Sequence, residues 1–381
     1  MHNPISKFLQ ERIDVNDFPS AVYLVAERGE IEFHEALGCA VVEPEKISAM
    51  TDTIYDLASL TKPLVTGLLA VKNLEIGMEF CLDDHISKLF SELDSNEVGE
   101  ITFKNLLTHT SGLKAWHPFY LESFQPGREA ESAKETIFRL PPDEQPNSSV
   151  IYSDLNFILL ERLLSKRATL TDLARSELFL RLGLQNTFFN PVTELKSRIA
   201  ASEIGNEYEK NTCIELGYLQ PYELRTPHSA FRNYQIWGEV HDGNAWFMGG
   251  IAGHAGLFST AEEVFKIALQ FLPDHTTLMK PETTKFFRTN FTKGMNEARS
   301  IAFQLAETPQ STAGSRMSPE SFGHLGFTGT SLWIDPVKDR IFILLTNRTH
   351  AHPLPFVNIN SVRRRFHDLA NDLLDKKTLA T

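Results

Sequence analysis

The sequence predicts a mixed α/β fold in which one antiparallel sheet, built from both chain ends, is flanked by helices. Strand patterns gather near the two ends, at 21–36 and 323–346. The region from about 75 to 290 reads mostly as helices and loops. This order predicts a sheet domain of residues 1–57 and 298–381, with a mainly helical domain of residues 58–297 inserted and a site between the two.

Length and composition exclude several classes of protein. The 381 residues, 42% of them hydrophobic, can bury a large core. A net charge of −12 argues against nucleic acid or an anionic membrane as the main partner. The three cysteines (Cys39, Cys81, Cys213) lack metal-type spacing and predict no disulfide framework.

Targeting signals are not evident in the chain. No basic segment followed by an apolar run opens it, and no apolar stretch approaches the roughly 20 residues of a membrane span. The sequence therefore predicts a cytoplasmic protein without a membrane span, or a periplasmic one if a leader was trimmed.

The first elements are a helix and a hairpin. Apolar residues recur at helical spacing over 4–14, which predicts an amphipathic helix. Two strand patterns, 21–26 and 31–36, flank a short segment in which Gly29 suits a turn.

The next element carries a Ser-x-x-Lys motif, Ala58-Ser-Leu-Thr-Lys-Pro63. On a helix, positions i and i+3 share a face, so the Lys62 amine can lie beside the Ser59 hydroxyl. Pro63 favours the first helical turn, which predicts a helix that begins near Ser59, at the positive end of its dipole. Ser59 is thus a candidate activated nucleophile; the alternative is a capping serine with a solvated lysine.

Helices dominate the middle of the chain. The predicted ones are 101–112, opened by a capping threonine and ended by Gly112, a helix near 131–139, 154–164, 170–184 closed by Gly183, and one opened by the capping box at Ser259-Thr260.

A second candidate motif is Tyr152-Ser-Asp154, at the start of the helix 154–164. Ser153 or Asp154 can simply cap that helix. Alternatively, Tyr152 reaches the Ser59–Lys62 pair as a proton shuttle, with its pKa lowered by the cation of Lys62.

Strands return near the C-terminus, at 323–334 and 341–346, before a last helix at 361–374. Three glycines interrupt the run Phe322-Gly-His-Leu-Gly-Phe-Thr-Gly-Thr330. They indicate either a weakened edge strand or a substrate-binding strand whose backbone N–H completes an oxyanion hole.

In this order the three motifs resemble the serine β-lactamase and penicillin-binding-protein superfamily. The flanking segments agree: Leu106-Leu-Thr-His-Thr-Ser-Gly-Leu113, Gly253-His-Ala-Gly-Leu-Phe-Ser-Thr260 and His324-Leu-Gly-Phe-Thr-Gly-Thr-Ser-Leu-Trp-Ile-Asp335. The likeness spans about 18–347. It looks closest to the class C branch, with its esterase and D-alanyl-D-alanine carboxypeptidase relatives, and implies a β-lactamase/transpeptidase-like fold with the active site between the domains.

The resemblance implies roles for individual residues. Ser59 is the acylated nucleophile, and Lys62 accepts its proton, with a pKa depressed by burial and nearby positive charge. Tyr152 passes a proton to the leaving group and activates the deacylating water. The N–H groups of Ser59 and Phe327 hold the oxyanion. No metal or cofactor is required, and the substrate-binding residues are Asp154, His324, Gly326 and Phe327.

Two positions depart from the family pattern. Many members have asparagine at the position of Asp154 and lysine at that of His324. A largely neutral histidine holds a substrate carboxylate less well than lysine does, although Arg348, His350 or His352 can compensate. Efficient β-lactam hydrolysis is therefore not expected to be the main activity.

The predicted function is that of a serine acyl-hydrolase that forms an acyl-enzyme on Ser59. Its substrate is an amide or ester such as a peptidoglycan-derived peptide, with β-lactams as further candidates. The alternatives are a promiscuous carboxylesterase with weak β-lactamase activity and a non-catalytic penicillin-binding sensor.

Two other patterns are not assigned a function. The glycine-rich run 250–256 lacks the preceding strand and opening of a phosphate loop and reads as a tight loop bordering the site. The histidine pairs 109/117, 241/254 and 350/352 lack the spacing of a familiar metal site.

Overall fold

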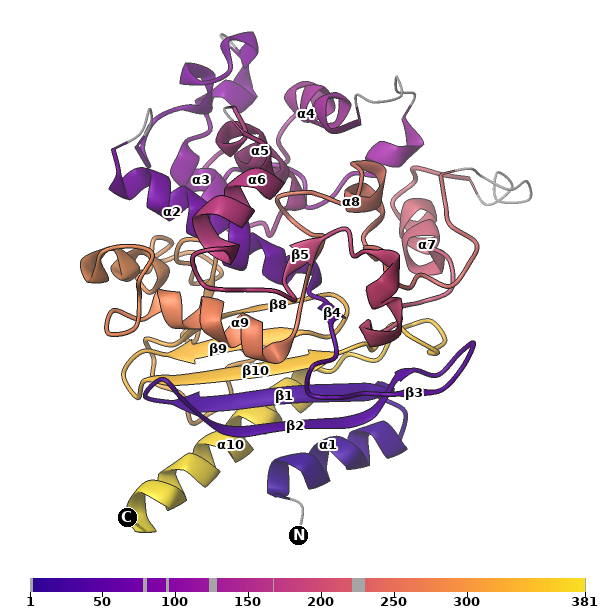
Figure 1. Cartoon of the computed structure of the whole chain (residues 1–381). Coiled ribbons are helices and arrows are strands. Elements are labelled where there is room, and N and C mark those ends of the chain that lie inside the picture. The colour runs from indigo at the N-terminus through magenta and orange to yellow at the C-terminus, as the bar shows by residue number, and fades with distance from the viewer. Residues whose placement is uncertain are drawn as a thin grey trace.

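A seven-stranded antiparallel sheet organises the structure, a computed structural model that describes residues 3–77, 81–93, 96–122, 129–166, 168–220 and 230–380. The strand order is β3-β2-β1-β10-β9-β8-β7 (Figure 1). The strands are β1 (Ser20–Glu27), β2 (Glu30–Val41), β3 (Ile47–Ser48), β7 (Gln304–Leu305), β8 (Phe322–Leu325), β9 (Ser331–Asp335) and β10 (Arg340–Thr346). Because β1 pairs with β10, the two chain ends meet within one sheet, as the sequence predicts.

A small second sheet and the helices complete the fold. The second sheet, in the order β4-β6-β5, contains β4 (Tyr55–Asp56), β5 (Phe188–Phe189) and β6 (Leu257–Ser259). The α-helices are α1 (Pro4–Asp14), α2 (Leu68–Glu75), α3 (Phe103–Thr108), α4 (Glu129–Arg139), α5 (Asp154–Leu164), α6 (Leu170–Ala174), α7 (Glu207–Glu215), α8 (Gly243–Phe247), α9 (Ala261–Ala268) and α10 (Asn360–Ala380). None of the described helices combines the length and apolar character that crossing a bilayer requires.

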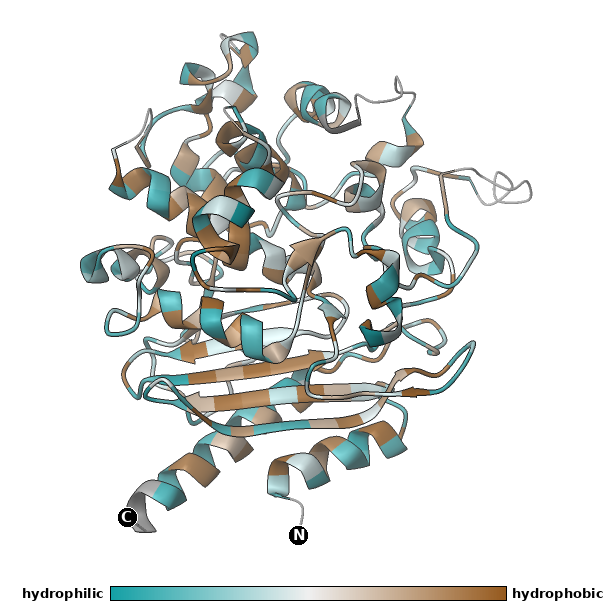
Figure 2. Cartoon of the chain, in the orientation of Figure 1, coloured by the Kyte–Doolittle hydropathy of each residue, from teal (hydrophilic) through white to brown (hydrophobic). Residues whose placement is uncertain are grey.

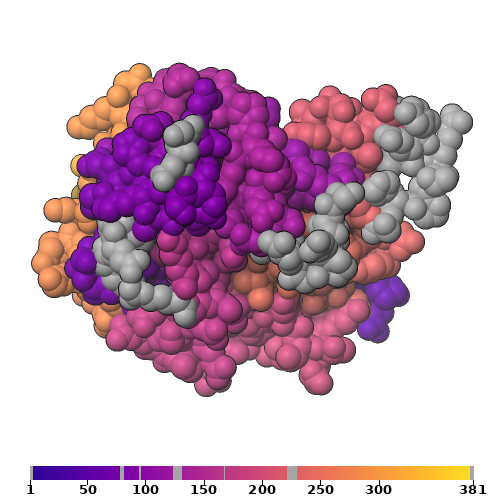
Figure 3. Space-filling model, turned by 90° about the horizontal axis from the view of Figure 1, so that it is seen from above, coloured from indigo at the N-terminus to yellow at the C-terminus, as the bar shows by residue number. Residues whose placement is uncertain are grey.

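Helices cover both faces of the main sheet. Helices α1 and α10 lie on one face, and the middle of the chain lies on the other (Figure 1). Seen from that second side, the surface is formed mainly by the purple to pink middle of the chain (Figure 3). The segments that the sequence places between the two halves of the sheet therefore form the layer on this face.

Alternation along the central strands explains this layering. In β1, Val22 and Leu24 join the core cluster beneath the middle of the chain, whereas Tyr23 and Val25 pack with α1 and α10. Both sets are buried, so β1 is apolar on both faces and is drawn largely in brown in Figure 2. A strand buried on both faces fixes its register, since a slip by one residue would exchange the two sets.

Most predicted helices are confirmed, with corrections at their ends. Helix α3 begins at a capping box between Thr102 and Asn105, as predicted. It ends at His109, not Gly112, because His109 adopts a left-handed conformation (φ 59°) and its N–H bonds the Asn105 carbonyl. The predicted helix 170–184 is α6 followed by a π-helical segment, Arg175–Phe179.

The predicted strand 323–334 is instead a hairpin. Strands β8 and β9 pair with each other, and residues 326–330 form the turn between them. Gly326 N–H donates to the Thr330 carbonyl, and Gly329 has a φ of 111°, a conformation suited to glycine. Two of the three glycines therefore serve the turn.

The division into a sheet domain and an inserted helical domain stays a prediction. Helix α9 belongs by sequence to the inserted segment 58–297, yet it packs against β1 and β10 of the main sheet.

Candidate active site

Ser59 lies in a tight turn at the start of a long helical segment. A 3₁₀ turn, Ala58–Leu60, is followed by a π-helical segment, Lys62–Gly67, and then by α2. Ala58 adopts a left-handed conformation with a φ of 48°, which is strained for a residue with a Cβ. This geometry places the Lys62 Nζ 3.0 Å from the Ser59 Oγ, as the motif predicts.

Lys62 is fully buried and surrounded by oxygen atoms. Its amine donates to the Ser59 Oγ and to the His254 carbonyl (3.1 Å), and it forms an ion pair with the Asp154 Oδ1 at 2.7 Å. Burial alone lowers the pKa of the amine, but the Asp154 carboxylate and Tyr152 outweigh it, and the pKa is raised. The predicted depression of the Lys62 pKa is therefore wrong, and Asp154 is the reason.

Tyr152 lies against the Lys62 amine, whose Nζ is 4.9 Å from the centre of the tyrosine ring. Burial raises the pKa of Tyr152, and interactions of its hydroxyl with Lys62 and Ser59 offset only part of the rise. Lys62 acts in the predicted direction, but the predicted net lowering of this pKa is wrong. The phenol is thus protonated in the resting site and can donate a proton.

The imidazole ring of His109 packs against the ring of Tyr152. The two rings lie 4.6 Å apart, and the His109 Nδ1 accepts a hydrogen bond from the Ser153 N–H at 3.1 Å. Burial and the charges of Arg299 and Lys62 hold the pKa of His109 well below its usual value. Ser153 occupies the cap position of α5, but its hydroxyl donates to the Lys114 carbonyl and does not cap the helix.

His324 presents a hydrogen-bond acceptor to the site. Its Nδ1–H donates to the Leu325 carbonyl at 2.9 Å, and its Nε2 is buried without a partner in the described structure. Burial and the nearby charges of Lys62 and Arg299 hold the pKa of His324 well below its usual value. A neutral imidazole with a free Nε2 can accept a hydrogen bond from a ligand but does not attract a carboxylate.

These side chains meet at a cavity of about 500 Å³. Lys62 reaches Ser59 from behind the wall, and the other predicted site residues line the cavity: Ser59, Tyr152, Asp154, His324, Gly326 and Phe327. A Cβ at Gly326 would come within 2.6 Å of the Leu57 carbonyl. The end of β8 can therefore pack against the nucleophile turn only with glycine at this position.

Several wall residues were not predicted as site residues from the sequence: Trp116, Tyr208, Glu209, His241, Asp242 and Arg299. Arg299 is buried, its Cζ lies 5.5 Å from the Tyr152 ring centre, and it pairs with Glu297 at 2.8 Å. Tyr208 and Glu209 lie on α7, a helix without a clear apolar period, and the others lie in connecting segments, so spacing gave no signal for them.

The three residues suggested to compensate for His324 do so only in part. Arg348 lines the cavity, but its guanidinium donates to the carbonyls of Phe327 and Val357. His350 bonds Val42 N–H and the Ser202 carbonyl, and the exposed His352 bonds the Pro353 carbonyl. Neither histidine lines the cavity.

One cluster has the composition of a metal site. Ligand atoms of Asp154, Asp242 and His254 lie within 4.8 Å of one another. The Lys62 ammonium contacts Asp154 and the His254 carbonyl in the same place, and His254 Nε2 pairs with Asp242 at 3.0 Å. The lysine therefore already supplies the cation that these carboxylates require.

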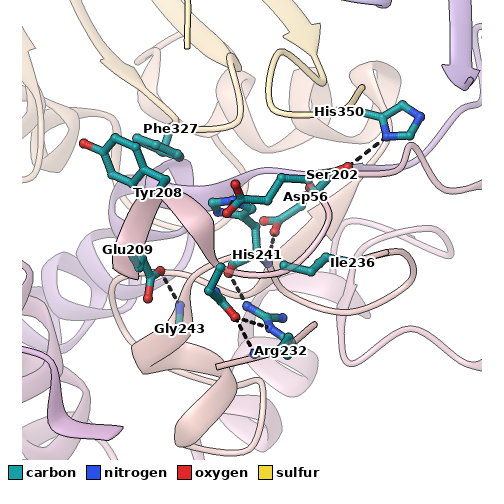
Figure 4. A network of polar contacts seen from close by, with 12 residues as sticks. Asp56, Ser202, Tyr208, Glu209, Arg232, Ile236, His241, Gly243, Phe327 and His350 are labelled. Carbon is teal, nitrogen blue, oxygen red and sulfur yellow. Dashed lines mark hydrogen bonds and ion pairs between the residues drawn. The ribbon is translucent and has the colours of Figure 1, made fainter. Parts of the chain in front are cut away.

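Asp56 ties the nucleophile turn to the cavity wall (Figure 4). It is buried, and its two oxygens accept the N–H groups of Ala58 (2.8 Å) and His241 (2.7 Å). These bonds hold both the strained residue before Ser59 and the residue before Asp242. No sequence pattern indicates this role of Asp56.

We expect Asp56→Asn to impair both stability and turnover. The amide NH₂ of asparagine cannot accept from one of the two N–H groups, which leaves a buried donor unpaired at a cost of about 1–3 kcal/mol. Urea unfolding measures that loss, and kcat for an ester substrate should fall with it. Asp335→Asn is the matched control, because Asp335 is equally buried and accepts the N–H of Ser318 far from Ser59. A fall in stability with unchanged kcat in both variants would show that Asp56 does not position the turn.

Comparisons with known proteins agree with this geometry. A family model described as Beta-lactamase matches residues 5–363. A protein of Escherichia coli (strain K12) named putative D-alanyl-D-alanine carboxypeptidase is 29% identical over 375 residues, which cover 92% of this chain and 82% of that protein.

Solved structures share the fold at low identity. EstCE1, a hydrolase with promiscuous acyltransferase activity, superimposes with a TM-score of 0.72 and 18% identity over 96% of this chain and 97% of its own. A class C β-lactamase from Rhodobacter sphaeroides gives a TM-score of 0.69 and 18% identity over 98% of this chain and 100% of its own.

Proposed function

The chain belongs to the Beta-lactamase family of serine hydrolases, and on this premise we propose that it hydrolyses an amide or ester through an acyl-enzyme on Ser59. The observation that carries the proposal is the fully buried Lys62 amine, 3.0 Å from the Ser59 Oγ and beside Tyr152, at the wall of a cavity large enough for a small peptide or ester. An amine in this position can take the serine proton as the oxygen attacks a carbonyl carbon.

Acylation begins when the proton of the Ser59 Oγ moves to the neutral amine of Lys62 and the Oγ–carbon bond forms. The carbonyl oxygen becomes an oxyanion, held by the backbone N–H groups of Ser59 and Phe327, both of which belong to cavity-lining residues. Tyr152 then gives its proton to the leaving nitrogen or oxygen. The bond to the leaving group breaks, and the acyl group stays on Ser59.

Deacylation reverses the proton movements with water as the nucleophile. The Tyr152 phenolate takes a proton from water, and the hydroxide attacks the acyl carbon. The bond to the Ser59 Oγ breaks, Lys62 returns its proton to that oxygen, and the free acid leaves. The raised pKa of Tyr152 makes its anion a strong base for this step.

The substrate that we favour is a peptide with a terminal carboxylate, as in peptidoglycan fragments. Arg299 supplies a buried guanidinium beside Tyr152, where the leaving group would lie, whereas the neutral His324 cannot bind an anion there. The name of the Escherichia coli relative fits this class of substrate. A carboxylesterase with weak β-lactamase activity is the second candidate, favoured by the apolar part of the wall at Phe327, Tyr208 and Leu216.

A substrate panel tests the proposal. Release of D-alanine from N-acetylated D-alanyl-D-alanine peptides, hydrolysis of p-nitrophenyl acetate, and the protein mass after mixing with benzylpenicillin are measured on one preparation. Release of D-alanine supports the peptidase, and ester hydrolysis alone supports the esterase. A penicillin adduct that persists without turnover of any substrate indicates a sensor, and the absence of all three signals contradicts the proposal.

We expect Asp154→Asn to extend activity to lower pH. The carboxylate of Asp154 raises the pKa of Lys62, and only the neutral amine accepts the serine proton. Removing the charge lowers that pKa, so the acid limb of kcat/KM moves down by at least about one pH unit, with about a tenfold gain near neutral pH. The ratio of amide to ester turnover should change as well, because asparagine adds a donor at the cavity wall.

The control for this variant is Asp172→Asn. Asp172 also lies in the first turn of a helix, α6, but it is exposed and bonds only local groups. Its replacement should leave the pH profile in place. An unchanged acid limb and an unchanged substrate preference in Asp154→Asn would remove the role assigned to Asp154.

A further inference from the structure

Charged side chains of both signs line the cavity. Arg299 contacts Tyr152, and its charge acts on His109 and His324. Lys62 and Ser59 lie next to them. Three carboxylates also line the wall, which are Asp154, Asp242 and Glu209.

Two of these carboxylates have a cation partner, and one does not. Asp154 pairs with Lys62, and Asp242 pairs with His254. Among the described residues, no lysine, arginine or histidine lies within ion-pair distance of Glu209. Its Oε1 accepts the Gly243 N–H at 2.7 Å, and its Oε2 is buried without a hydrogen-bond partner in that part of the chain (Figure 4).

Burial of the Glu209 carboxylate without a cation partner is energetically unfavourable. Its residue is only 7% exposed, yet it lines the cavity. Burial and the neighbouring Asp242 raise its pKa to about 7, although His241, Gly243 and Tyr120 lower it in part. A buried carboxylate without a cation is stabilised by any ligand that brings one.

Aromatic rings surround the same end of the cavity. Tyr208, which precedes Glu209 on α7, packs against Phe327 at a ring distance of 4.6 Å, and His241 stacks on the other side of Phe327 at 5.4 Å (Figure 4). Trp116 also lines this cavity. Arg348 already lies over Phe327, with its Cζ 4.9 Å from the ring centre, and the other aromatic faces beside the carboxylates favour an organic ammonium group.

From this arrangement we infer that the Glu209–Asp242 end of the cavity binds a free ammonium group on the acyl part of the substrate. The inference rests on the proposed function. Tyr152, which protonates the leaving group, lies beside Arg299, and we place the acyl part of the substrate on the Glu209–Asp242 side of Ser59. The substrate class is then an amide or ester of an amino acid whose own amine is free, such as a short zwitterionic peptide.

Binding to the Ser59→Ala variant tests the inference without interference from turnover. Isothermal titration calorimetry compares D-alanyl-D-alanine with its N-acetyl derivative, and the L,L pair is measured in parallel. The free-amine peptide of the preferred configuration should bind at least about tenfold more tightly than its acetylated form, as one desolvated ion pair provides. Introducing Glu209→Gln should reduce that ratio to about one.

Glu207→Gln is the matched control. Glu207 lies two residues earlier on α7, is exposed and pairs with Lys210, so its replacement should keep the tenfold ratio. Equal affinities of free and acetylated peptides, or a ratio that survives Glu209→Gln, would overturn the inference. The first comparison needs no change at Glu209 and holds even if that variant folds poorly.

Hydrolysis of p-nitrophenyl acetate by the wild-type protein distinguishes failure of the ammonium subsite from failure of the proposed function. Ester hydrolysis without a preference for a free amine refutes the ammonium subsite alone. The proposed function is refuted only if no ester, peptide or penicillin reacts.

Discussion

Replacing Ser59 by alanine is expected to abolish covalent chemistry. The Ser59 Oγ lies 3.0 Å from the buried Lys62 amine at the cavity wall, and alanine leaves no hydroxyl to acylate there. Removing the nucleophile of a serine hydrolase typically costs about 10⁴-fold or more in kcat. Initial rates on p-nitrophenyl acetate and the protein mass after mixing with penicillin measure the two losses.

Ser259→Ala separates loss of the nucleophile from loss of stability. Ser259 is buried on β6 and its hydroxyl bonds the Thr187 Oγ1, so its removal also leaves a hydroxyl without its partner. This control should retain both the adduct and ester turnover. Hydrolysis by Ser59→Ala at the wild-type rate would place the nucleophile elsewhere.

The second large effect is expected for Lys62→Met. Methionine fills a similar volume but offers no proton acceptor, and positioned proton transfer contributes about 10²–10⁴-fold to rates. The acylation rate should fall by that factor at every pH, and the acid limb assigned to Lys62 should disappear from the profile. Stopped-flow measurement of product release in the first turnover reports acylation directly.

The chain offers a close control in Lys72→Met. Lys72 is the other largely buried lysine of the same helical segment, and it pairs with Glu177 at 3.1 Å, away from the cavity. Each variant removes a largely buried lysine from an ion pair, but only Lys62→Met removes the proton acceptor. An acid limb that persists in Lys62→Met would assign that pKa to another group.

The fold could be predicted largely from local patterns. The alternation in β1 and β10, the hairpin after β1 and the helices α1, α5 and α9 each follow from a few neighbouring residues. The ends of helices were predicted less well. Helix α3, for example, ends at His109, three residues before the predicted end at Gly112. A histidine in a left-handed conformation is stabilised by contacts from Ser153 and Asn156, which lie far along the sequence.

The site divides in the same way. Ser59, Lys62, Tyr152 and His324 belong to short motifs, and the structure brings them together. The signs of two pKa shifts were wrong because they depend on the balance between burial and a carboxylate, which spacing does not reveal. Arg299, Glu209 and Asp242 belong to no motif or periodic pattern in the sequence, and only the tertiary structure assigns them to one cavity.

The pairing of β1 with β10 also constrains how the chain can reach its native state. Ala21 faces Thr346 in that ladder, so the centre of the sheet joins segments from nearly opposite ends of the polypeptide. Contacts of such sequence separation fold slowly, because a long loop must close before they form. During synthesis the β1–β2 hairpin emerges early. Its apolar residues stay exposed until β10 has been made and can pair with β1. We therefore expect refolding from urea to be slow and to show concentration-dependent aggregation, a cost that follows directly from closing the sheet with the last strand.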